Sequence, residues 1–253
     1  LTMNIEKFAI GTDQSLETAT NSVVRFANAF GWTLDGNTQE IWKFLNVVNL
    51  VSKRTASTAD EVLAAATEFA PYAKMLNISA ANAVAFAAVL PSLGLSADEA
   101  GTALKNMAVY AIENADLISQ AMAPVNEAYQ DTESVINLLN TNAAQVFVDI
   151  TKAAQGTATT GKDAAGAIKQ VMDIFEMRGG RAMAVMVNNS KLLTDTIVIA
   201  NQEWGNGASL LADYERAMSS TQSQVALFKN NLNDAGITIG EVLLPVLNDI
   251  IQV

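Results

Sequence analysis

The chain has 253 residues, of which half are hydrophobic and 16% are charged, and its formal net charge is −11. This much apolar material favours a packed core over disorder, and the acidic balance disfavours binding to a phosphate backbone. The chain has no histidine and no cysteine, which excludes disulfides, thiolate chemistry, serine triads and the commonest metal ligands. We therefore expect no enzyme, no catalytic residue, no cofactor and no metal site.

Abundant alanine predicts an all-α chain, because alanine is the best helix former. We predict an N-terminal helical bundle over residues 1–112. Its helices are expected over 13–30, ended by Gly31, and then from N-caps at Asn37, Thr58, Ser79 (ending near Pro91) and Ser96. Glutamate follows three of these caps at the capping-box position, at Glu40, Glu61 and Glu99.

The stretch "LGLSADEAGTALKNM" (93–107) combines a helix start with small residues. The Ser96 hydroxyl is expected to accept from the amide of Glu99, and the Glu99 carboxylate from the amide of Ser96. Gly101 and its alanine neighbours would let a second helix approach closely. The predicted helix-packing motif consists of Ser96, Glu99, Ala100, Gly101, Thr102 and Leu104.

Residues 75–97 form a charge-free run that could be mistaken for a membrane span. A spanning helix needs about 20 predominantly apolar residues. Only "AVAFAAVL" (83–90) at the centre of this run is strongly apolar, and Pro91 follows it. We predict a buried helix followed by a turn.

Residues 113–206 are predicted to be a second helical segment. Its helices are expected over 132–139, 143–154, 163–177, 182–189 and 192–204, with glycine and serine marking the turns.

Residues 207–253 are predicted to form a long heptad-patterned helix, in a chain that we expect to be a fragment of a longer protein. Apolar residues spaced by three and four imply that this helix packs on another helix, in this chain or in a second copy as a coiled coil. Gly236 and Pro245 should bend it. The predicted seam contains Leu211, Tyr214, Met218, Val225, Phe228, Leu232, Ile239, Val242 and Val246.

Two stretches could bind an anion. "GTATTGKD" (156–163) matches the G-x-x-x-x-G-K phosphate loop, but Asp163 stands where a magnesium-binding hydroxyl is needed, and no buried strand precedes it. "MRGGRAM" (177–183) could present amides and two arginines, Arg178 and Arg181, at a helix start. We favour an inter-helix loop for the first stretch and a solvated turn for the second.

Three segments resemble the core region of phage tail tape measure proteins, in the order found in that family. The first (47–107) contains "EAGTAL" at 99–104, and the second is "IFEMRGGRAM" (174–183), in which Glu176 stands where the family usually has glycine. The third is "GITIGEVLLPVLNDII" (236–251), with Gly240, Glu241 and Pro245 at the motif positions.

The resemblance implies a structural protein of the virion that occupies the lumen of the tail tube or lies at the tail tip. It is made in the host cytoplasm, sets tube length during assembly and aids DNA ejection. The implied partners are the tail tube protein, tail tip or baseplate hub proteins, tail assembly chaperones, further copies of the chain (for example in a trimer) and the host envelope. No specific nucleic-acid binding is expected.

This chain has too many short helices and turns to be the extended ruler, so we interpret it as a folded segment that leads into a rod after Leu211. Two alternatives stay open. One is a membrane-active helical protein, such as a pore former or secretion translocator. The other is a wall-degrading enzyme module.

Overall fold

The computed structural model describes residues 2–159 and 164–219. Within these ranges the fold is all-α, as predicted, with no strand. The helices are α1 (Thr2–Thr12), α2 (Leu16–Phe30), α3 (Thr38–Arg54), α4 (Ala59–Met75), α5 (Ala80–Ser92), α6 (Ala97–Glu113), α7 (Ala115–Met122), the short 3-10 helix η1 (Glu127–Tyr129), α8 (Thr132–Thr159), α9 (Ala164–Asn188), α10 (Ser190–Asn206) and α11 (Ser209–Met218).

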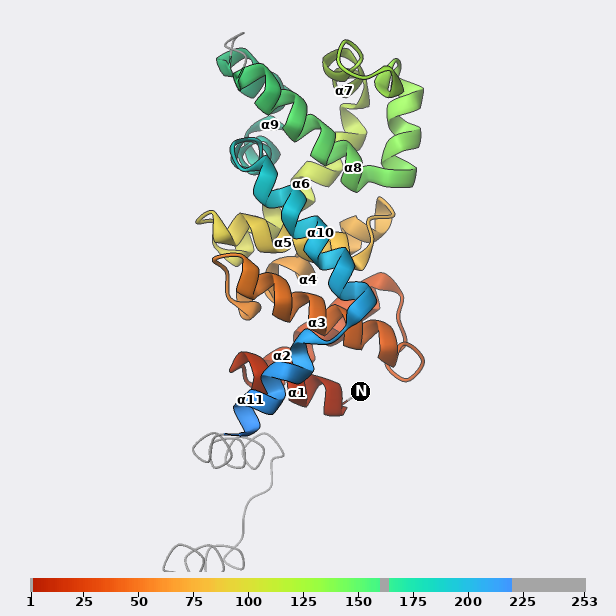
Figure 1. The fold of residues 1–253 in the computed structure, drawn as a ribbon. Coiled ribbons are helices and arrows are strands. Elements are labelled where there is room, and N and C mark those ends of the chain that lie inside the picture. The colour runs from red at the N-terminus through yellow and green to blue at the C-terminus, as the bar shows by residue number, and fades with distance from the viewer. Residues whose placement is uncertain (1, 160–163, 220–253) are drawn as a thin grey trace, which may run out of the picture.

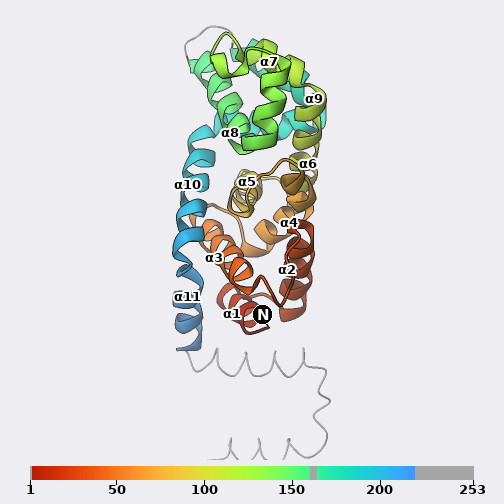
Figure 2. The ribbon, with the colours of Figure 1, turned by 90° about the vertical axis from the view of Figure 1, so that its right-hand side faces the viewer.

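The helices form an elongated stack of three layers (Figures 1 and 2). Helices α2, α4, α6 and α9 follow one another along one layer, and α1, α3 and α5 form the next. The third layer consists of α10 and α11, which run back along the stack across α5, α3 and α1. The end of the described chain is thereby brought beside its beginning.

Helix α5 lies at the centre of this stack and contacts α3, α4, α6 and α10. Residues 83–91 of α5 are all fully or almost fully buried. Because neighbours surround the helix on all sides, it needs no polar face. The predicted buried helix is therefore confirmed, and none of the described helices is long and apolar enough to cross a membrane.

Most predicted helix ends in the first half are confirmed. Gly31 ends α2 in a left-handed conformation (φ 73°), the capping box of Thr58 with Glu61 is formed, and the Ser79 hydroxyl accepts from the amide of Asn82. In α2, however, Ser15 is the N-cap, and the predicted start at residue 13 was too early. Helices α1 and α7 were not predicted, because each is short and has no capping box.

The predicted capping box at Asn37 and Glu40 is wrong. Asn37 occupies the N-cap position of α3, but its side chain makes no capping hydrogen bond. Its Oδ1 atom instead accepts from the amide of Thr33, at 3.0 Å, and so closes the preceding loop. The backbone of Asn37 (φ −109°, ψ 35°) is also outside the extended conformation that N-caps usually adopt.

Helices α8 and α9 each contain a break. In α8 it falls at Asn142 (φ −155°, ψ 52°), between the two helices predicted over 132–139 and 143–154. In α9 it falls at Glu176 (φ 51°, ψ −175°). The turn predicted over 178–181 is therefore wrong, since Gly179 and Gly180 lie inside the helix.

Contacts cross the predicted segment boundaries at 112 and 206. Helix α10, from the predicted second segment, packs against α3 and α5, and α9 packs against α6. Buried side chains from all three predicted segments join in one hydrophobic cluster. The division into 1–112, 113–206 and 207–253 remains a prediction.

Candidate helix-packing site

The predicted helix-packing motif begins with the capping box at the start of α6. The Ser96 hydroxyl accepts from the amide of Glu99 at 3.3 Å, and Glu99 Oε2 accepts from the amide of Ser96 at 2.9 Å. The hydrogen bond from the Ser96 backbone, followed by that from its hydroxyl, lowers the pKa of Glu99. Both bonds satisfy backbone or side-chain groups of the helix end, so this carboxylate has a structural role.

At Gly101, α6 packs closely against α4. A Cβ atom added at Gly101 would lie 2.8 Å from Cβ of Glu68 and 2.5 Å from its Oε2 atom. Thr102, the next residue, donates from its hydroxyl to Glu68 Oε1 at 3.0 Å. The Glu68 side chain therefore occupies the space that any side chain at position 101 would need.

Gly179 makes a matching contact on the α9 side of α6. A Cβ atom added there would lie 3.1 Å from the backbone nitrogen of Met107 and 3.3 Å from its Cα atom. Helix α6 is thus packed between α4 and α9 with a glycine at each contact. The missing side chains allow the helix backbones to approach, and this approach explains why position 179 carries a glycine.

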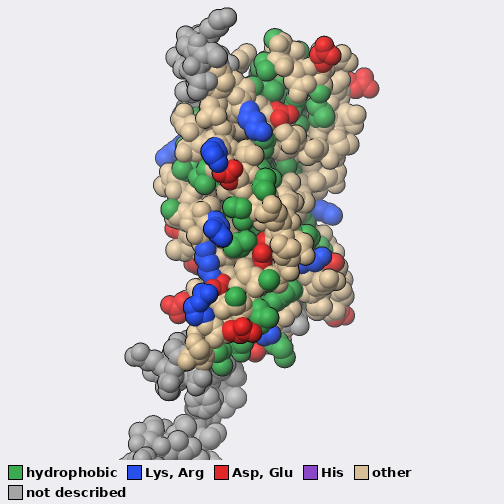
Figure 3. Space-filling view, in the orientation of Figure 1, with side chains coloured by type: hydrophobic (Ala, Val, Ile, Leu, Met, Phe, Trp, Pro, Cys, Tyr) green, Lys and Arg blue, Asp and Glu red, His purple; other side chains and the backbone are tan. Residues whose placement is uncertain are grey.

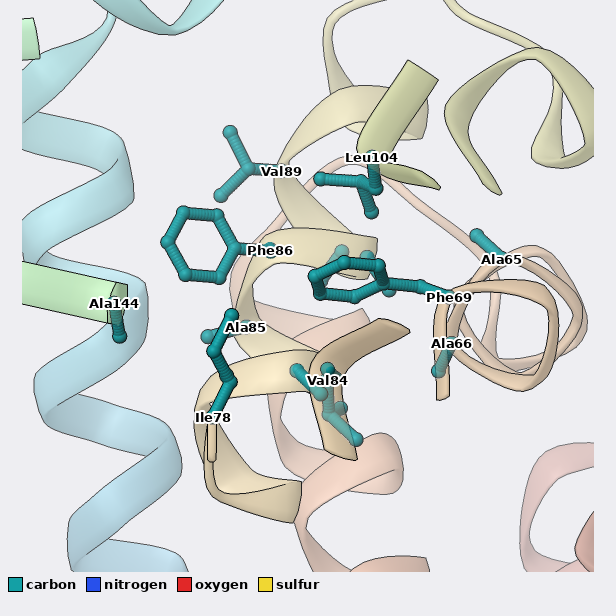
Figure 4. Close-up of a cluster of buried hydrophobic side chains, with 14 of the residues drawn as sticks. Ala65, Ala66, Phe69, Ile78, Val84, Ala85, Phe86, Val89, Leu104 and Ala144 are labelled. Carbon is teal, nitrogen blue, oxygen red and sulfur yellow. The ribbon is translucent and has the colours of Figure 1, made fainter. Parts of the chain in front are cut away.

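The apolar residues of the motif are buried in the core, which also contains a series of four aromatic rings. Ala100 and Leu104 are fully buried, and Leu104 lies close to Phe69 and Phe86 (Figure 4). Phe69, Phe86, Phe147 and Phe175 come from α4, α5, α8 and α9. They contact one another in series edge to face, with centroid distances of 6.5, 5.9 and 6.3 Å. Such pairs add about 0.5–1.5 kcal/mol each beyond the burial of their area.

Of the two arginines considered for an anion site, Arg181 is the one whose side chain the structure describes. Arg181 lies 3.9 Å from Glu99, and both side chains are more than half exposed. An ion pair this exposed contributes little to stability. Asn114 at the end of α6 donates to the backbone oxygen of Ile174, at 2.7 Å, and so fixes the chain just before the break.

A second packing site, which the sequence analysis missed, lies where α10 and α11 cross α3. Asn46 and Asn49 of α3 are fully buried, and Asn46 Oδ1 accepts from the amide of Leu210 at 2.9 Å. Glu203 of α10 is also buried, and its Oε1 atom accepts from the amides of Ala208 and Ser209. The signal was available, since these asparagines interrupt an otherwise apolar helix face.

Asp213 is the charged centre of this second site. It accepts from Asn49 Nδ2 at 2.6 Å and forms ion pairs with Lys53 of α3 and Arg216 of α11. Burial alone would raise the pKa of Asp213, but the hydrogen bonds from Lys53 and Asn49 and the two positive charges lower it below its usual value. On the face that carries α10 and α11, charged side chains of both signs are interspersed (Figure 3).

The predicted seam is described only at its first three positions. Leu211 is 42% exposed, whereas Leu210 is fully buried against the bundle, so the buried face of α11 is shifted by one residue from the predicted seam. Tyr214 and Met218 are partly buried. The remaining seam residues (Val225, Phe228, Leu232, Ile239, Val242 and Val246) and the C-terminal motif (Gly240, Glu241 and Pro245) lie outside the described residues.

The described residues contain no cluster of acidic side chains that could hold a metal ion. The phosphate-loop match begins inside a helix, because α8 continues to Thr159, and residues 160–163 lie outside the described part. What residues 2–159 and 164–219 do build is two helix-packing sites.

The geometry thus defines the class: an all-α protein whose organised contacts join helices to helices. The sequence model of the phage-related minor tail protein family matches residues 2–122. This match supports a phage tail protein with a structural role in the virion, in contact with other tail proteins. No curated protein and no solved structure matches the chain.

Proposed function

We propose that this chain is a folded segment of a tail tape measure protein and has no enzymatic activity. The observation that carries the proposal is the family match over residues 2–122, which includes the first of the three tape-measure segments and the whole helix-packing motif. The "EAGTAL" residues of that segment form the close contact of α6 with α4.

The stack itself is a poor length ruler. A ruler made of helix extends by about 1.5 Å per residue, whereas the described helices fold back on one another. We therefore assign length determination to extended parts of a longer chain. In this proposal the described stack is a folded unit at the tail tip or at one end of the tube lumen, and the chain after α11 leads into a rod.

The partners follow from this role. The tail tube protein would polymerise around the rod. Tail assembly chaperones would keep the chain competent for assembly, and tail tip or baseplate hub proteins would contact the stack. A homo-oligomer, such as a trimer, would use the seam from Leu211 onward. The exposure of Leu211 in the single chain is consistent with a contact to another helix. Expulsion during infection would bring the protein to the host envelope, where it aids DNA ejection.

The test is a set of in-frame deletions and substitutions in the complete gene, with tail length measured by electron microscopy. Deletions in helical regions outside this stack should shorten tails by about 1.5 Å per deleted residue. Gly101→Val, within the stack, should reduce the number of tails without changing the length of those that form. Gly205→Ala is the matched control, because a Cβ atom at Gly205 meets nothing within 4 Å. Tails of normal length from every deletion would contradict the proposal.

A further inference from the structure

We propose that α11 is a releasable clamp, which swings away from α1 and α3 about Gly207 while α10 stays docked. This inference concerns the second packing site and goes beyond the structural role proposed above. Gly207 and Ala208 form the only non-helical link between α10 and α11, and Gly207 has a left-handed backbone (φ 58°). The two helices are therefore separate elements, which are joined by this link and by the hydrogen bonds from the amides of Ala208 and Ser209 to Glu203 Oε1. In the link, glycine accepts a change of backbone angles most readily.

The two helices are held by different kinds of contact. Helix α10 docks through buried side chains of Leu193, Thr196 and Ala200, with Ile197 and Trp204 packed against the core. In α11 Leu210 is the only buried residue. Since apolar burial is the main source of docking energy, α11 is the weaker of the two attachments.

The surface beneath α11 is polar, which is unusual for a permanent helix contact. Asn46 and Asn49 bind Leu210 and Asp213 of α11, and Lys53 binds Asp213 as well. These polar groups can all be hydrated when α11 leaves, and Leu210 is the one fully buried side chain of α11 that its release exposes. Moreover, Asn49 Oδ1 is buried and receives no hydrogen bond from any described group, a cost that release would remove.

The docked position is nevertheless specific. A Cβ atom at Gly11 of α1 would lie 3.2 Å from Leu210 and 3.6 Å from the backbone nitrogen of Tyr214, so α1 and α11 are in close contact. The ammonium group of Lys7 lies 5.7 Å from the ring centre of Tyr214 and 5.8 Å from that of Trp42. A close fit joined by polar bonds is typical of an interface that opens and recloses.

Release can be measured by amide hydrogen exchange on the full chain at neutral pH. The amide of Leu210 donates to Asn46 and not to its own helix, so its exchange reports undocking of α11 and not fraying. The amide of Leu193 donates to the backbone oxygen of Asn189, so its exchange reports opening of the first turn of α10 and serves as the reference for that helix. We expect the Leu210 amide to exchange at least about tenfold faster than the Leu193 amide, because α11 opens locally while α10 stays docked.

Thiol modification gives an independent measurement, because the chain has no cysteine of its own. Leu210→Cys and Leu193→Cys each place one thiol at a fully buried position, in α11 and α10 respectively. The thiol in α11 should react at least about tenfold faster with a soluble reagent under native conditions.

The matched variants are Lys53→Ala, which removes the ion pair between α3 and α11, and Lys191→Ala, which removes an ion pair within α10. Lys53→Ala should speed exchange at Leu210 at least about threefold without affecting Leu193. Lys191→Ala should change neither rate. Equal exchange rates at Leu210 and Leu193, in the original chain and in both variants, would overturn the proposal.

Discussion

The two packing sites of this molecule stabilise helix contacts in opposite ways. Between α4, α6 and α9, glycines at positions 101 and 179 bring backbones together beside four fully buried phenylalanine rings. Between α3 and α11, asparagines and one aspartate form the contact, and a single leucine is buried from α11. The first contact depends on shape and cannot open without exposing the core, whereas the second can exchange its partners for water. Removing a group should therefore have very different effects at the two sites.

The largest effect is expected in the aromatic series of the first site. Phe86→Ala removes a fully buried ring that contacts Phe69 and Phe147. It should lower the free energy of unfolding by about 3–5 kcal/mol, measured by urea denaturation. Met3→Ala, at a side chain that is 66% exposed, is the control and should change it by less than about 0.5 kcal/mol. A loss below about 1 kcal/mol for Phe86→Ala would show that the core is loosely packed.

The next effect tests the close approach of α6 to α4. Gly101→Val forces a branched side chain against Glu68 and should cost about 1–3 kcal/mol of unfolding free energy. Gly205→Ala, in α10 with open space around it, should instead stabilise by up to about 1 kcal/mol, because alanine is the better helix former. Because the two substitutions should change the free energy of unfolding in opposite directions, the comparison distinguishes the effect of close packing from that of helix propensity. If both substitutions increase the free energy of unfolding, a glycine at position 101 is not needed for the packing of α6 against α4.

A smaller effect, of opposite sign, is expected at the break in α9. Glu176 has φ 51° and ψ −175°, a backbone conformation that favours glycine. Glu176→Gly should stabilise the protein by about 1 kcal/mol, measured by thermal unfolding. Asp173→Gly, at a helical position of the same element, should destabilise by about 0.5–1 kcal/mol. Destabilisation by both changes would contradict the strain at Glu176.

The smallest effect concerns pH and the second site. The pKa of Asp213 is lowered in the folded chain. The stability that its carboxylate adds is therefore complete above the ordinary pKa of 3.8 and is lost as the pH falls through the lowered pKa. Its charged neighbours are Lys53 and Arg216; Glu203 caps the same helix, and Lys7 lies over Tyr214.

Acid should therefore loosen α11 before the stack unfolds, at a cost below about 1 kcal/mol. Tryptophan fluorescence can follow this step, because a Cβ atom added at Gly207 would lie 3.8 Å from Trp42 Nε1, and Trp204 contacts Trp32. Asp213→Asn should remove the fluorescence change that accompanies the loosening of α11 in acid. The fluorescence change that accompanies global unfolding should remain. If the fluorescence change persists in the variant, another carboxylate is responsible.

Local sequence signals predicted the parts of the fold that depend on neighbours along the chain. The capping boxes at Thr58 and Ser96 are formed as expected, because the donor and acceptor are three residues apart on one helix end. Asn37 fails as a cap because its side chain accepts instead from the amide of Thr33, four residues earlier, a competitor that the capping-box pattern does not include. The turn near Gly179 was misplaced because glycine also serves close helix contacts.

The partners of each site could not be predicted in the same way. Gly101 was expected to meet another helix, but nothing in the sequence identified Glu68 as its contact, since 33 positions separate the two residues. The polar contacts of Asn46 and Asn49 join residues more than 160 positions apart. Such pairings depend on how the layers stack, which periodicity leaves open.

The amino-acid sequence by itself determined that this protein is helical, where most of its helices begin and which residues are apolar enough to be buried. These properties follow from propensity, capping and periodicity, all of which act within a few residues. Only the tertiary structure decided that α10 and α11 return along the stack, that α6 lies between α4 and α9, and that Leu210, not Leu211, is buried. The physical reason is that an apolar helix face specifies burial but not the neighbour that buries it.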